Sequence, residues 1–357
     1  MAFGLLAILA CRDPEPYRIG VVLTATGNPG AVLATEFINR NGGIGGVPLV
    51  LVNLGDSPTG SAPLALDAAE RLVADPRVLA VVGHSNSSAS LAASQVYNSR
   101  HVVQIAPTST TPLFNRAGPW SFRLVASDEY QAPFIAAAVA AEHPDRVAVV
   151  YVNDVYGRSL NSLLAHELEK SKIAVVATLP YVETESANQS DLVSSLAKYR
   201  PTLLVWLGRS AYFDDITAPL GKALPGLRVL ASDGFGGRTA RLDSSVLGEV
   251  RHVRLVDMNR ADTTLQRVRQ LYREREKTEI NDEAALSYDA VLLLAEAIRR
   301  VGPDRARVRE WLSHVGRDAP AYNGITGPIA FVNGGSRKAQ YSWGIAHAAS
   351  PVPRRAP

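Results

Sequence analysis

Cysteine and long apolar runs are both scarce in this 357-residue chain. Its single cysteine, Cys11, has no second cysteine to pair with, which excludes an intramolecular disulfide. No apolar run approaches the roughly 18 residues that a membrane-spanning helix requires. Apolar residues make up 46% and charged residues 20%, a composition that indicates neither a largely disordered nor a fibrous protein. These features predict a globular protein, and its length suits two domains that each bury a core.

Lysine is also scarce, and the many arginines build no continuous basic surface. There are 31 Arg and 6 Lys, but 34 acidic residues reduce the net charge to +3. The densest basic stretches, residues 251–275 and 299–309, are interrupted by Asp and Glu, which is typical of a solvated helix face. The sequence therefore predicts no nucleic-acid partner.

The chain begins with an apolar run, Met1–Ala10, that ends at the cysteine. Ten residues are too few to span a bilayer but fit the apolar part of a signal peptide. Ile8-Leu9-Ala10-Cys11 resembles a bacterial lipobox, which predicts lipidation of Cys11 and a place in the periplasm or on the outer face of the cell membrane. Residues 1–16 would then be signal segment and tether. The alternative is an ordinary frayed N-terminus with a buried cysteine.

From Tyr17 onward, short apolar runs alternate with helical segments. This pattern predicts an α/β fold with parallel strands and crossover helices. A long helix is expected over residues 283–300, followed by a strand pair formed by residues 327–332 and 341–345. The other predicted strands cover residues 17–23, 49–53, 78–82, 102–105, 147–151, 173–179, 202–207 and 228–231.

Polar loops follow these strands, where ligands bind in open parallel sheets. Residues 83–88 and 106–111 are dense in hydroxyls, and the loops after later strands contribute an aromatic and a carboxylate. Hydroxyls and helix-start amides suit a ligand carboxylate, while Asp233 suits an ammonium group. Together they describe an α-amino acid. The alternative for any one loop is that its Ser, Thr, Asn or Asp only caps a helix or forms a turn.

Signals for an enzyme are weak. Gly83-His84-Ser85-Asn86-Ser87 has Ser where a hydrolase nucleophile elbow has its second Gly. Gly43-Ile44-Gly45-Gly46 precedes a strand, the reverse of the order in a dinucleotide site. The seven histidines are scattered, so neither a metal site nor a cofactor is predicted, and His84 is expected to have a structural role.

Several motifs together resemble the leucine/isoleucine/valine-binding protein family. They are Asn41-Gly42-Gly43-Ile44-Gly45-Gly46, Gly83-His84 with its serines, Ile105-Ala106-Pro107-Thr108-Ser109-Thr110, Val155-Tyr156-Gly157, Ser232-Asp233-Gly234 and Ser287-Tyr288-Asp289-Ala290. The resemblance implies a type I periplasmic-binding-protein fold with two lobes joined by three crossovers. It also implies a binding protein of an ABC importer, working with an ABC permease, rather than an enzyme. A ligand-sensing or regulatory lipoprotein with the same fold is the alternative.

The resemblance also implies domain boundaries. Lobe one would take residues 17–125 and 257–325, and lobe two would take residues 126–256 and 326–347. Residues 348–357 would form a disordered tail.

Ligand contacts are implied in the same way. Ser87 and Thr110 would hold the ligand carboxylate. The carbonyl of Thr108 and the carboxylate of Asp233 would hold its ammonium group.

Lobe two would supply the remaining contacts. Tyr156 would line the pocket, and Arg209 is a candidate contact for a second anionic group on the ligand. The loop from Thr24 to Gly30 is shorter than is usual in the family, and Ser210 and Ala211 are small where relatives present an aromatic. Specificity for branched-chain amino acids is therefore not expected to carry over.

Overall fold

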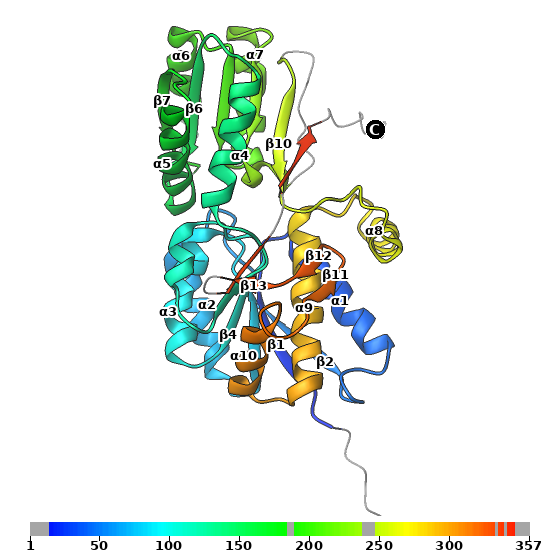
Figure 1. The fold of residues 1–357 in the computed structure, drawn as a ribbon. Coiled ribbons are helices and arrows are strands. Elements are labelled where there is room, and N and C mark those ends of the chain that lie inside the picture. The colour runs from blue at the N-terminus through cyan, green and yellow to red at the C-terminus, as the bar shows by residue number, and fades with distance from the viewer. Residues whose placement is uncertain (1–13, 184–188, 238–246, 333–334, 339–340, 347–357) are drawn as a thin grey trace, which may run out of the picture.

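The structure is a computed structural model that describes residues 14–183, 189–237, 247–332, 335–338 and 341–346. These residues form two α/β lobes, stacked end to end, each built around its own sheet (Figure 1). The eight strands predicted from apolar runs are all present, with every limit within two residues of its predicted position.

The first lobe contains a seven-stranded sheet in the order β13-β14-β5-β4-β3-β1-β2. Its strands are β1 Tyr17–Val22, β2 Leu49–Asn53, β3 Val78–Gly83, β4 Val103–Ala106, β5 Ser121–Arg123, β13 Phe331–Val332 and β14 Ser336–Arg337. The chain adds β2 on one side of β1 and β3 on the other. This reversal creates a switch point at the carboxyl ends of β1 and β3, where parallel sheets leave a crevice.

The second lobe repeats this arrangement in a six-stranded sheet with the order β15-β10-β9-β8-β6-β7. Its strands are β6 Val147–Val152, β7 Val175–Tyr181, β8 Leu203–Leu207, β9 Arg228–Ala231, β10 Val250–Arg254 and β15 Ser342–Ile345. Here β7 and β8 are added on opposite sides of β6, which gives a second switch point. A separate hairpin joins β11 Tyr322–Gly324 to β12 Gly327–Ile329.

Helices pack in pairs against these sheets. In lobe one α1 packs on α9 and α2 on α3, which gives the sheet an apolar core on each face. In lobe two α4 packs on α5 and α6 on α7. The helices are α1 Asn28–Arg40, α2 Ala62–Ala74, α3 Ser87–Ser99, α4 Asp128–Ala141, α5 Val155–Lys170, α6 Gln189–Tyr199, α7 Ser210–Ala223, α8 Thr263–Glu276, α9 Asp282–Val301 and α10 Arg305–His314, with 3-10 turns η1 Pro112–Arg116 and η3 Asp233–Gly237.

Local chemistry fixes the helix starts that face the other lobe. The Asp154 carboxylate accepts a hydrogen bond from the Gly157 amide at 2.9 Å and caps α5. Gly157 packs so closely on β6 that a Cβ would lie 2.0 Å from the Val152 carbonyl oxygen. The Asn281 side chain accepts from the Ala284 amide at 2.8 Å and caps α9. These contacts set where each helix N-terminus points.

The chain passes between the lobes at three places: from β5 to α4, from β10 to α8, and from β14 to β15. The predicted lobe boundary at residue 326 is wrong, because β13 and β14 belong to the sheet of lobe one. The buried Arg337 holds this segment there by donating to the Thr326 carbonyl and hydroxyl, both at 2.8 Å. Of the described strands after α10, β15 alone lies in the sheet of lobe two.

Two smaller expectations are also wrong. The predicted strand pair does not form, because β12 pairs with β11 and β15 pairs with β10. The basic stretch that starts at residue 251 begins as strand β10 and becomes helical only at α8. Val250 and Val253 point into the core of lobe two, which places this segment in the sheet despite its charges.

The N-terminal segment and the tail lie outside the described residues. Lipidation of Cys11 and the predicted disorder of residues 348–357 therefore remain predictions. Within the described chain, every helix is too short or too polar to cross a bilayer.

Candidate functional site

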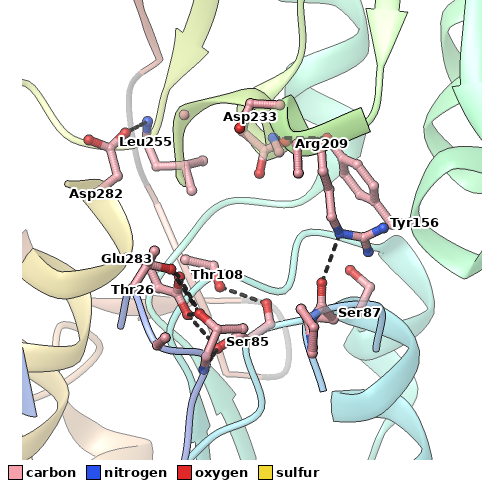
Figure 2. Close-up of a pocket in the computed structure, with 18 residues that line it drawn as sticks. Thr26, Ser85, Ser87, Thr108, Tyr156, Arg209, Asp233, Leu255, Asp282 and Glu283 are labelled. Carbon is pink, nitrogen blue, oxygen red and sulfur yellow. Dashed lines mark hydrogen bonds between the residues drawn. The ribbon is translucent and has the colours of Figure 1, made fainter. Parts of the chain in front are cut away.

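A cavity of about 280 Å³ lies between the two lobes, where both switch points meet. Lobe one contributes the loops after β1, β3 and β4, and lobe two contributes the loops after β8 and β9 (Figure 2). The first turns of α3, α5, α7 and α9 also line it. Helix N-termini carry partial positive charge and free amides, so this geometry suits a small polar solute.

Several hydroxyl groups line the lobe-one side of the cavity. Ser87 is the first residue of α3, and its Oγ accepts a hydrogen bond from the Thr111 amide at 3.4 Å. Thr108 donates to the Ser85 carbonyl at 2.7 Å, which ties the loop after β4 to the loop after β3. Ser85, Ser87 and Thr108 all line the cavity, so two of the predicted contacts in this lobe lie where a ligand would meet them.

Thr110 differs from the other predicted contacts. Its side chain is fully buried and does not line the cavity. Its carbonyl accepts from the Asp128 amide at 2.9 Å, at the passage from β5 to α4. Direct contact with a ligand is therefore not available to Thr110 in this conformation.

Tyr156 and Asp233 form a polar corner in lobe two. The Tyr156 hydroxyl lies 2.6 Å from Asp233 Oδ1 and 2.7 Å from Ser232 Oγ. Gln131 Nε2 donates to Asp233 Oδ1 and to Asp128 Oδ1, both at 2.8 Å. The Asp233 carboxylate is thus held in one orientation at the cavity wall.

Burial dominates the electrostatics of this corner. It raises the pKa of the Asp233 carboxyl, and the hydrogen bonds from Tyr156 and Gln131 offset only part of the increase. Burial also raises the pKa of Asp128, with a further increase from the charge of Asp233. A cation bound beside Asp233 would favour its charged form.

Arg209 lines the cavity, but its charge is already compensated. Its guanidinium pairs with Asp154 at 2.8 Å and Glu183 at 2.7 Å. It also donates to Asn86 Oδ1 at 3.1 Å, a hydrogen bond that crosses from lobe two to lobe one. Burial lowers its pKa and the charges of the two acids raise it, with a net increase. This geometry favours a bridge between the lobes over the predicted contact with a second anionic group.

Glu283 is a cavity residue that the sequence reading missed. It lies in the first turn of α9 and accepts hydrogen bonds from the hydroxyls of Thr24, Thr26 and Ser85. An acidic residue at a helix start is common, because it complements the helix dipole, and nothing in the sequence distinguishes Glu283 from that role. Only the fold brings it next to residues about 200 to 260 positions away.

Neither a metal-binding group nor a cavity-lining histidine is found in the described part of the molecule. No group of three or more His, Cys, Asp or Glu side chains is arranged there to hold a metal ion. His84 is fully buried outside the cavity lining, with Nδ1 3.4 Å from Asp56 and Nε2 3.2 Å from the Tyr97 hydroxyl. This is the structural position expected for it.

Comparison with known proteins places the chain among binding proteins. The model of the family described as "Periplasmic binding protein" matches residues 16–346. An "Amino acid binding protein" of Pseudomonas aeruginosa is 34% identical over 146 residues, which is 40% of this chain and only 38% of that relative's own length. The "Leucine-, isoleucine-, valine-, threonine-, and alanine-binding protein" of the same species is 25% identical over 329 residues, or 87% of this chain and 81% of the relative.

Solved structures share the whole architecture. The branched-chain amino acid transporter substrate-binding protein LivJ of Streptococcus pneumoniae, solved in complex with isoleucine, superposes with a TM-score of 0.81 at 19% identity. The match covers 92% of this chain and 95% of that one. The predicted type I periplasmic-binding-protein fold is therefore confirmed. The names of these relatives agree with the expectation that the chain is not an enzyme.

Proposed function

The chain belongs to the periplasmic binding protein family, and from this premise we propose that it binds an α-amino acid or a close analogue for an ABC importer. The observation that carries the proposal is the shared cavity. Hydroxyls at the start of α3 face it from one lobe, and the oriented carboxylate of Asp233 faces it from the other. A zwitterion supplies a carboxylate to the hydroxyls and amides at the start of α3 and an ammonium group to Asp233.

The proposed contacts follow from the position of each group. The ligand carboxylate would lie at the N-terminus of α3, where Ser87 and the backbone amides donate hydrogen bonds. Its ammonium group would donate to Asp233 and to the Thr108 carbonyl, beside the ring of Tyr156. Because these groups belong to different lobes, a bound ligand stabilises the closed arrangement by its higher affinity for that state.

The proposal includes a cellular setting. The chain would work outside the cytoplasm, held to the membrane by a lipid on Cys11, and an ABC permease would recognise its closed form. The names of relatives as transporter substrate-binding and amino-acid-binding proteins support this setting.

Native mass spectrometry of gently purified protein tests the proposal, because a solute held between two lobes can survive isolation. We expect a mass increase equal to one small amino-acid-like molecule per chain. Isothermal titration calorimetry against the standard amino acids should then give a stoichiometry of one. Absence of both a trapped solute and any titratable amino acid would contradict the proposal.

The bridge between Arg209 and Asn86 gives a prediction about closure. Asn86→Ala removes a hydrogen bond between the lobes and leaves Arg209 paired with Asp154 and Glu183. A net contribution of about 1–1.5 kcal/mol to the closed state corresponds to an affinity loss of about five- to tenfold. Calorimetry measures that loss of affinity. In small-angle scattering without ligand, Asn86→Ala should have a larger radius of gyration than the wild type.

The control is Asn153→Ala, an exposed residue outside the cavity lining whose side chain accepts a hydrogen bond from Arg158 within lobe two. Asn153→Ala should change neither the affinity nor the radius of gyration. Equal effects of the two substitutions would rule out the bridge as a determinant of closure.

A further inference from the structure

A second carboxylate faces the cavity from the side opposite Asp233. Glu283 projects from the start of α9 in lobe one, whereas Asp233 follows β9 in lobe two (Figure 2). Thr26 donates to Glu283 Oε2 at 2.5 Å, and the Thr24 hydroxyl lies 2.9 Å from both carboxylate oxygens. Ser85 Oγ accepts from the Thr24 amide at 3.0 Å, which directs its own hydrogen toward Glu283. The carboxylate is therefore fixed in place before any ligand arrives.

These donors leave the carboxylate able to accept more. Each hydroxyl has one hydrogen, so Thr24, Thr26 and Ser85 together supply three hydrogens to a group with about four lone-pair positions. All three donors are neutral. Within the described chain, no Lys, Arg or His side chain forms an ion pair with Glu283. The carboxylate thus has both an open acceptor position and an uncompensated charge.

The charge balance of the whole cavity points the same way. Arg209 is already paired with two carboxylates, Asp154 and Glu183, and has no positive charge left for Glu283, while Asp282 is paired with Arg254. The zwitterionic head of an amino acid brings one positive and one negative charge, so it cannot compensate both Asp233 and Glu283. A ligand with a second positive charge compensates both.

We infer that the preferred ligand is a basic amino acid, with its side-chain cation on Glu283. The inference rests on the proposed function, because it assumes that the α-ammonium group occupies Asp233. Ala25, Pro58 and Leu255 also line the cavity and offer apolar contacts for the aliphatic stem of such a ligand. Glu283 would then determine specificity, and Asp233 would serve every α-amino acid.

The competing explanation is purely structural. By accepting from Thr24 and Thr26, Glu283 also fastens the loop after β1 to α9, and an acidic side chain favours the start of a helix. In that case its loss would weaken binding of all ligands alike and lower the melting temperature. The two roles differ in which ligands lose affinity.

The test titrates lysine, ornithine, arginine, leucine, alanine and glutamine into the wild-type protein and into Glu283→Gln by calorimetry. Glutamine at this position keeps the size and one acceptor oxygen but removes the charge. We expect the wild type to prefer the basic amino acids. Glu283→Gln should reduce their affinity by about 10- to 100-fold and leave the neutral amino acids within about threefold. Glu70→Gln, an exposed acid on α2 outside the cavity, is the charge-matched control and should change nothing.

Each outcome decides the question. A wild type that prefers neutral amino acids overturns the inference but leaves the proposed function intact. An equal loss for all ligands in Glu283→Gln also overturns it and assigns Glu283 a structural role. If no amino acid binds, both the inference and the proposed function fail.

Discussion

Asp233→Asn should nearly abolish amino-acid binding. The change keeps the shape of the side chain and an acceptor for Tyr156 and Gln131, but it removes the charge that faces the ligand ammonium group. Leaving a buried ammonium group without its charge partner costs about 2–5 kcal/mol. This corresponds to a dissociation constant that is roughly 30- to 5,000-fold higher. Isothermal titration calorimetry measures this directly.

The matched control for this experiment is Asp145→Asn. Asp145 is an exposed acid of the same lobe, away from the cavity, so its neutralisation changes the net charge equally without touching the site. The affinity of Asp145→Asn for amino acids should equal that of the wild type. In Asp233→Asn itself, the loss of charge also removes the repulsion between residue 233 and Asp128. The melting temperature of this variant should therefore not fall. A folded Asp233→Asn protein that binds as tightly as the wild type would disprove the proposed role.

The strands could be predicted because their burial leaves a direct record in the sequence. Strands such as Val147–Val152 and Leu203–Leu207 are covered on both faces, so nearly every residue is apolar. Ser336–Arg337 has no such record, because it is short, polar and held by the hydrogen bonds of Arg337. Which sheet it joins depends on a partner more than 200 residues earlier, and no local pattern contains that information.

The site could be predicted to the extent that it follows strand ends. Five of the six predicted ligand contacts line one cavity, because the carboxyl ends of parallel strands meet at one edge of each sheet. Residue type alone could not show that Thr108 faces the cavity while Thr110 turns inward. It also could not show that Arg209 meets two carboxylates from its own lobe. The place of Glu283 in the cavity could not be predicted, because its hydroxyl partners lie far from it in the sequence.

The buried corner of Asp233 also predicts a pH dependence of binding. Only the charged carboxylate attracts an ammonium group, and burial raises the pKa at which that charge is lost. Affinity should therefore be constant at pH values above this raised pKa and should fall as the pH drops through it. A bound ammonium group lowers the pKa again, so binding in that range releases up to one proton. The expected limiting slope is about a tenfold loss of affinity per pH unit.

Titrations from pH 8 down to pH 4.5, in two buffers of different ionisation enthalpy, measure both the slope and the released proton. The hydrogen-bond partners of Asp233 include Gln131 and Tyr156, and the buried Asp128 and Tyr341 lie close enough to interact with its charge. Tyr156 stays protonated throughout this range because burial raises its pKa well above 10. Asp128, whose pKa is also raised, remains as a source of proton exchange in Asp233→Asn. Asp233→Asn should therefore lose most of the dependence of affinity on pH and keep only the part that Asp128 contributes. An equally steep dependence in the wild type and in Asp233→Asn would show that another group titrates.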